Sequence, residues 1–303
     1  MVGRPHTPSG ARSTGRNRPL APSRPRPGAR GGRRPPRRRP RRPPSELRSR
    51  VLTAVPLIAL ALFLVIEGGL VFTIGLLVLG AACMHELYGM YERAHPVRLA
   101  GLIALAGLLF AALYGNQFQV LLAAVVALPL LFLLTLVQRR PSVAGMSLTL
   151  LGIYWIGFAL AHAVLLRGLP HGLGIVIDVL VGVFLGDTAA YLGGRMFGRR
   201  PLAPHISPNK TVEGLVIGMA FAILGVWIAG RYQEWLPGTH ALVLGVGVAL
   251  VAPLGDLFES FVKRQASAKD SGGLFGPHGG ALDRLDGVLF AAVAGYYIWA
   301  AYV

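Results

Sequence analysis

The sequence predicts an all-α polytopic membrane protein with about nine transmembrane helices and a disordered basic N-terminal tail. Two properties of the 303-residue chain indicate this class: 53% of its residues are hydrophobic and only 14% are charged, against about 25% charged residues in soluble domains. The third is the uneven charge. The first 50 residues hold 16 arginines and one glutamate, so nearly all of the net charge of +17 lies at the N-terminus.

Residues 1–46 are rich in Arg, Pro and Gly and have almost no large apolar side chain to bury, so we expect a disordered cytoplasmic segment. Such a tail either attracts anionic lipid headgroups or RNA, or is a solvated extension that fixes the orientation of the chain. We predict membrane lipids as its surroundings and no specific nucleic-acid partner. The single cysteine, Cys83, excludes a disulfide framework and a cysteine metal cluster.

The rest of the chain consists of apolar runs that are long enough to cross a bilayer, which takes roughly 17–25 residues. We expect helices at 50–66, 70–88, 99–115, 119–137, 146–166, 172–193, 211–230, 239–258 and 285–303. Residues 47–170 form the N-terminal transmembrane helices in this division. Residues 171–303 form a catalytic transmembrane region with cytoplasmic loops at 194–210 and 259–284.

Charge gives an independent test of this topology, because short cytoplasmic loops are enriched in Lys and Arg. With the tail inside, the outer loops carry only Arg167 and Arg231. The inner loops carry Arg93, Arg98, Arg139, Arg140, Arg195, Arg199, Arg200, Lys210, Lys263, Arg264, Lys269 and Arg284. We therefore expect a multi-pass protein of the cell (inner) membrane, with the N-terminus and both long loops in the cytoplasm and the C-terminus outside.

The polar segment 260–286 has the composition of a phosphoryl-transfer site. Its glycines let backbone N–H groups approach an anion, and Asp283 and Asp286 are suited to a divalent cation. Its cations, which suit phosphate oxygens, are Lys263, Arg264, Lys269 and Arg284. The only three lysines of the chain, Lys210, Lys263 and Lys269, all lie in the two cytoplasmic loops, which favours phosphate binding by compact ammonium groups.

Two upstream segments carry further candidates. Asp187 lies inside an expected helix, where an ionised carboxylate is costly and indicates function. The run Ser207–Thr211 precedes a helix start that supplies N–H donors for a phosphate. Asp256 and Glu259 share one helical face; alone they suggest capping or a salt bridge to Arg264, but beside Asp283 and Asp286 they favour Mg²⁺.

These residues resemble the signature of the phosphatidate cytidylyltransferases, the CDP-diacylglycerol synthases. The resemblance covers residues 187–286 and is carried by fixed spacings. Its elements are Asp187, Tyr191, Gly194-Arg195, Phe197-Gly198, Ile206 to Thr211, Glu213-Gly214, Gly255-Asp256, Glu259-Ser260, Lys263-Arg264, Lys269-Asp270, His278 to Gly280, Asp283-Arg284 and Asp286.

The resemblance implies an Mg²⁺-dependent nucleotidyltransferase that converts CTP and phosphatidate to CDP-diacylglycerol and pyrophosphate, and that forms homodimers. It leaves open a second, monovalent cation. Asp256, Asp283 and Asp286 are expected to bind metal, and Lys263, Arg264, Lys269 and Asp283 to act in catalysis. His278 either donates to the leaving group or shapes a Gly-rich turn. The expected substrate contacts are Asp187, Tyr191, Arg195, Ser207, Lys210, Glu213, Ser260, Asp270 and Arg284.

A transporter is the alternative from another class, because Asp178 and Asp187 inside one helix could describe an ion pathway. Transport predicts charged or broken-helix positions near the midplane of several helices. In this sequence the polar groups gather toward one face of the membrane, which favours the enzyme.

Overall fold

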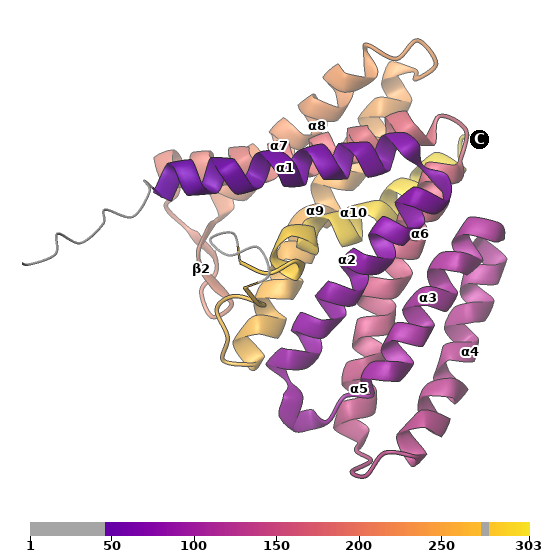
Figure 1. The fold of residues 1–303 in the computed structure, drawn as a ribbon. Coiled ribbons are helices and arrows are strands. Elements are labelled where there is room, and N and C mark those ends of the chain that lie inside the picture. The colour runs from indigo at the N-terminus through magenta and orange to yellow at the C-terminus, as the bar shows by residue number, and fades with distance from the viewer. Residues whose placement is uncertain (1–45, 274–278) are drawn as a thin grey trace, which may run out of the picture. The chain divides into compact units, whose positions relative to one another are not determined.

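The computed structural model describes residues 46–273 and 279–303, and helices dominate them (Figure 1). The N-terminal helices are α1 (Glu46–Glu67), α2 (Gly69–Met90), the 3₁₀ turn η1 (Glu92–Ala94), α3 (Arg98–Tyr114), α4 (Gln117–Leu136), α5 (Val143–Gly152), the π turn η2 (Ile153–Gly157) and α6 (Phe158–Gly168). The C-terminal helices are α7 (Gly172–Phe197), α8 (Val212–Gly230), α9 (Gly238–Gln265) and α10 (Leu282–Ala300). The expected disordered tail, 1–46, lies outside the described residues except for Glu46.

Six helical segments in the described part of the chain are long and apolar enough to cross a membrane, which makes the chain a multi-pass membrane protein. They are Gly69–Met90, Gln117–Leu136, Val143–Gly168, Gly172–Phe197, Val212–Gly230 and Gly238–Gln265. Val55–Glu67 and Arg98–Tyr114 are shorter apolar helices. The 19-residue α10 is not among the six, because Asp283, Arg284 and Asp286 place three charges in its first two turns. All nine expected segments are thus helical, while six meet the criteria for a span.

The helices on either side of the predicted loops are longer than expected. α7 continues to Phe197, past the expected end at 193, and α9 continues to Gln265, past 258. Lys263 is therefore presented from a helix and not from a loop. The segment 194–210 also contains a structure that the sequence did not suggest: strands β1 (Pro201–Ala203) and β2 (Ser207–Thr211) form an antiparallel hairpin.

The four C-terminal helices α7, α8, α9 and α10 pack against one another. Small residues permit the close approach of α7 and α8: a Cβ added at Gly218 would lie 2.7 Å from Ala190 Cβ and 2.8 Å from the Gly186 carbonyl oxygen. Such stripes of small residues are typical of membrane helix pairs. The packing holds the end of α7, the start of α8 and the last turns of α9 near one another, where the candidate site lies.

Candidate active site

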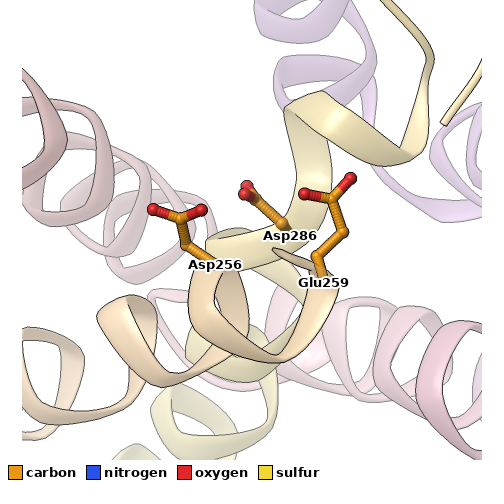
Figure 2. Close-up of side chains that lie close together, drawn as sticks. All are labelled: Asp256, Glu259 and Asp286. Carbon is orange, nitrogen blue, oxygen red and sulfur yellow. The ribbon is translucent and has the colours of Figure 1, made fainter. Parts of the chain in front are cut away.

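Three carboxylates converge between α9 and α10. Figure 2 shows the carboxylates of Asp256 and Glu259, from α9, and of Asp286, from α10, side by side. Their ligand oxygens all lie within 4.8 Å of one another. The Glu259 side chain is only 1% exposed, and its Oε1 has no hydrogen-bond partner among the described residues. Beyond the ion pairs that Lys210 and Lys263 make with Asp256 and Glu259, a cation bound among the three carboxylates would offset their mutual repulsion. This set of hard oxygen ligands fits Mg²⁺.

Lys263 connects this carboxylate cluster to Asp283. Its Nζ lies 2.7 Å from Glu259 Oε2 and 2.6 Å from Asp283 Oδ1. Asp283 also accepts hydrogen bonds from the N–H groups of Ser271, at 3.1 Å, and Gly280, at 2.8 Å. Burial disfavours the charge of Asp283, and the hydrogen bonds that it accepts from Lys263, Ser271 and Gly280 favour it. Lys263 thus lies between Asp283 on one side and Glu259 of the carboxylate cluster on the other.

A cavity of about 650 Å³ adjoins the carboxylate cluster and is bounded by α7, α8, α9 and the hairpin. Its polar lining consists of Asp187, Tyr191, Arg195, Ser207, Asn209, Lys210, Thr211 and Asp256. Lys210 forms an ion pair with Asp256. Asp256 thus belongs to both the cavity and the cluster, and a group bound beside Lys210 would lie next to the metal-binding carboxylates.

The cavity is amphipathic along its length. Apolar residues from the middle of the helices, such as Val183, Met219 and Val248, line one part. The cations Arg195 and Lys210 come from the end of α7 and from β2, which meet at the same end of the bundle. An apolar chamber with cations at one end suits a molecule that has a phosphate headgroup and acyl chains.

Two predicted site residues, Glu213 as a substrate contact and Arg264 as a catalytic residue, have structural partners. Glu213 Oε2 accepts the N–H groups of Arg199, at 3.0 Å, and Arg200, at 3.2 Å, and so fixes the connection from α7 to β1. Arg264 donates from Nε to the Ile206 carbonyl at 3.2 Å, which ties the end of α9 to the hairpin.

The remaining candidates lie around the ends of α9 and α10. Ser260 is half-buried on α9, Lys269 and Asp270 are exposed after that helix, and Arg284 is exposed on α10. His278 lies outside the described residues. The structure thus brings Asp187, Tyr191, Arg195, Ser207 and Lys210 together around the cavity, and it places Lys263 and Asp283 beside the cluster.

The sequence analysis missed Glu86 on α2. This buried carboxylate accepts hydrogen bonds from the Ala281 N–H at 3.0 Å, the Leu282 N–H at 3.1 Å and the Ser271 hydroxyl at 3.0 Å. Nearly 200 residues separate Glu86 from these partners, so no local pattern joins them. The available signal was an acidic residue inside an apolar segment, the same signal that identified Asp187.

The fold and this site define a membrane enzyme of nucleotidyl transfer, and comparison with known proteins agrees. Residues 48–302 match the cytidylyltransferase family, and the chain belongs to it. The chain is 33% identical over 266 residues to the phosphatidate cytidylyltransferase of Bacillus subtilis, covering 84% of this chain and 98% of that protein.

Two other relatives extend this likeness. The phosphatidate cytidylyltransferase of Brucella suis is 33% identical over 265 residues, or 83% of this chain and 93% of that protein. That of Staphylococcus aureus strain COL is 34% identical over 252 residues, or 80% of this chain and 95% of that protein. These findings confirm the resemblance seen in the signature, and they give no support to the transporter.

Proposed function

We propose that this enzyme transfers the cytidylyl group of CTP to phosphatidate, which gives CDP-diacylglycerol and pyrophosphate in phospholipid biosynthesis. The observation that supports this most is the shared Asp256, which lines an amphipathic cavity and also belongs to a carboxylate cluster. A lipid phosphate and a nucleotide phosphate would meet at this point. The relatives named for this activity, similar over nearly their whole length, support the same reaction.

The reaction is an in-line displacement at phosphorus. A phosphate oxygen of phosphatidate attacks the α-phosphorus of CTP, the bond from that phosphorus to the bridging oxygen breaks, and pyrophosphate leaves with the electron pair. A phosphate monoester is already ionised near neutral pH, so no strong general base is required. Positioning and charge neutralisation carry most of the catalysis.

The cofactor that we propose is Mg²⁺, held by Asp256, Glu259 and Asp286. These residues fit it because Glu259 Oε1 is buried without a partner among the described residues, and the three ligand oxygens are close together. Bound there, the cation would supply positive charge beside the reacting phosphates. Asp283, which the sequence also suggested as a ligand, orients Lys263 instead in this proposal. A second, monovalent cation is a further proposal that rests on the resemblance alone.

The basic residues divide between the two substrates. We assign Lys210 and Arg195, in the cavity, to the phosphate of phosphatidate, with Asp187, Tyr191 and Ser207 around it. We assign Lys263, Arg264 and Lys269 to the triphosphate and the leaving pyrophosphate, with contributions from Ser260, Asp270 and Arg284. His278 keeps both of its proposed roles, as a donor to the leaving group or as part of a turn. Glu213 acts through the segment that carries Arg199 and Arg200.

The topology that we propose has nine spans, with α1, α3 and α10 crossing in addition to the six candidates. Residues 1–46 form a disordered cytoplasmic tail, 47–170 the N-terminal helices and 171–303 the catalytic region. The charge asymmetry of the loops supports a cytoplasmic active site and an outer C-terminus in the cell (inner) membrane. The resemblance supports a homodimer.

The test uses the full chain, solubilised in detergent and supplied with radiolabelled CTP, phosphatidate and Mg²⁺. We expect label in a lipid fraction that co-migrates with CDP-diacylglycerol, and release of pyrophosphate in equal amount. Diacylglycerol, which lacks the phosphate nucleophile, is the matched control and should give no labelled lipid. The absence of CDP-diacylglycerol with phosphatidate would overturn the proposal.

A further inference from the structure

Glu86 lies on α2, outside the signature that carries the candidate site, yet its carboxylate contacts the segment that leads into α10. We propose that Glu86 is a positioning residue for the metal-binding carboxylates: it fixes the start of α10 and thereby the place of Asp286. The inference deepens the proposed function and rests on it, because it assigns to the N-terminal helices a part in building the reaction site.

Both carboxylate oxygens of Glu86 accept hydrogen bonds. Oε1 accepts the Ala281 N–H, and Oε2 accepts both the Leu282 N–H and the Ser271 hydroxyl. Leu282 is the first residue of α10, so Glu86 satisfies N–H groups that a helix start leaves without intrahelical partners. A negative charge at that position also interacts favourably with the helix dipole. Charge-assisted hydrogen bonds of this kind are stronger than neutral ones.

Burial makes these bonds hard to replace by water. Glu86 is 8% exposed, Ser271 5%, and Ala281 and Leu282 are fully buried. A buried N–H group that loses its acceptor cannot form a hydrogen bond to water instead, and this costs free energy. Removing the carboxylate would therefore force the start of α10 to move.

Two glycines show that the surrounding segment is fitted to this carboxylate. A Cβ at Gly272 would collide with Glu86 Oε1, and a Cβ at Gly280 would collide with Glu86 Oε2 and the Ser271 hydroxyl. Any larger residue at either position would displace the acid. Gly280 of the signature thus has a steric reason that depends on a residue outside the signature.

Asp283 also accepts hydrogen bonds from the backbone of the segment that leads into α10. It accepts the N–H groups of Ser271 and Gly280, while Glu86 accepts the Ser271 hydroxyl and the next N–H, that of Ala281. The two carboxylates together fix the entry into α10. Asp286 follows one turn later on that helix, and its distance from Asp256 and Glu259 depends on where the helix starts. A displacement of about 1 Å at a reacting centre costs on the order of 100-fold in rate.

The test compares Glu86→Gln with the wild type. Glutamine keeps the size, but its NH₂ group donates, so it would face an N–H donor that needs an acceptor. In purified full-length protein without substrates, we expect Mn²⁺, used as a probe for Mg²⁺ and followed by electron paramagnetic resonance, to bind about 10-fold more weakly. In the CDP-lipid assay, we expect kcat to fall and the KM for phosphatidate to stay unchanged.

Glu92→Gln is the matched control, because Glu92 follows α2 and its exposed side chain pairs only with Arg98 among the described residues. It should leave Mn²⁺ binding and kcat unchanged. Ser271→Ala is a second, less disruptive variant, to be used if Glu86→Gln does not fold. It removes one hydrogen bond to Glu86 and should weaken Mn²⁺ binding about 5-fold.

Unchanged Mn²⁺ affinity in folded Glu86→Gln, or in Ser271→Ala if the first variant does not fold, would overturn the inference. A loss of folded protein with normal metal affinity in the remaining fraction would show a purely structural role and overturn it as well. A wild type that binds Mn²⁺ but makes no CDP-lipid would contradict the proposed function, and the comparison of Mn²⁺ affinities would still decide the role of Glu86.

Discussion

Helix α7 carries two acidic residues whose surroundings differ, although only nine positions separate them. Asp178 is fully buried, and its Oδ1 accepts a hydrogen bond from Gln233 Nε2 at 2.8 Å. Asp187 is exposed to the cavity, which Arg195 and Lys210 also line. Within the described part of the chain, neither a cation nor a second carboxylate is paired with Asp178.

This difference distinguishes a carboxylate that faces a candidate substrate cavity from one that is buried and hydrogen-bonded to a neighbouring amide. An acid in a membrane helix indicates function in general, and in the described part of the chain the end of α7 near Asp187 combines a cavity, cations and further carboxylates. Nearer the other end of α7, the side-chain amide of Gln233 donates a hydrogen bond to Asp178. The transporter hypothesis treated Asp178 and Asp187 as one pathway, whereas the structure gives them separate surroundings.

The strongest test of this contrast is Asp256→Asn. The substitution removes a proposed metal ligand and the ion-pair partner of Lys210, so we expect CDP-lipid formation to fall by at least about 100-fold. The rate of label transfer at saturating CTP measures this. An activity within a few-fold of wild type would separate the carboxylate cluster from the reaction.

The next largest effect is expected for Lys210→Gln. Losing a charged hydrogen bond to a phosphate costs roughly 1.5–3 kcal/mol, so the KM for phosphatidate should rise about 10- to 100-fold while the KM for CTP changes less. Lys269→Gln, in the segment that follows α9, should show the reverse pattern. If Lys210→Gln raised mainly the KM for CTP, our division of the cations between the substrates would be wrong.

The two ends of α7 can be compared directly by the same substitution. Asp187→Asn removes a charge that faces the cavity, and we expect activity to fall about 10-fold through altered positioning of the lipid phosphate. Asp178→Asn keeps a hydrogen-bonding partner for Gln233 and should stay within about 2-fold of wild type. Steady-state rates of the two variants, measured side by side, give the comparison. Equal losses would show that the two acids belong to one functional unit.

The smallest effect on activity is expected for Gln233→Leu. This change leaves the Asp178 carboxylate without its amide donor in a buried place, which costs about 1–3 kcal/mol of stability. Thermal inactivation in detergent should therefore be faster, with the initial rate per folded molecule unchanged. A selective loss of kcat with normal thermal stability would assign Asp178 a part in the reaction.

The sequence allowed much of the helical architecture to be predicted, because long apolar runs and loop charges follow directly from the bilayer as solvent. It also singled out Asp256 and Asp286, which the structure brings together, since acidic residues at the ends of apolar runs are conspicuous. Glu259 was expected to share a helical face with Asp256 near a metal site, although it was not among the ligands that the resemblance implied. Its place in the carboxylate cluster depends on α9 continuing to Gln265, past the expected helix end at 258.

Other features could not be predicted, because they depend on contacts between distant segments. The partner of Asp283 is Lys263, a choice that depends on how α10 packs against α9. Glu86 meets its partners only after α2 has packed near the start of α10. The hairpin was missed because two short strands that contain prolines have little β-propensity, and only tertiary packing holds them.

The most direct measurement is the position of Mn²⁺ in crystals of the full chain grown with Mn²⁺ and CTP, located by anomalous diffraction. Our account predicts an anomalous peak between Asp256, Glu259 and Asp286, with the nucleotide phosphates beside it and toward the cavity that contains Lys210. A peak on Asp283 with Lys263 displaced, or a nucleotide bound away from the carboxylate cluster, would contradict it.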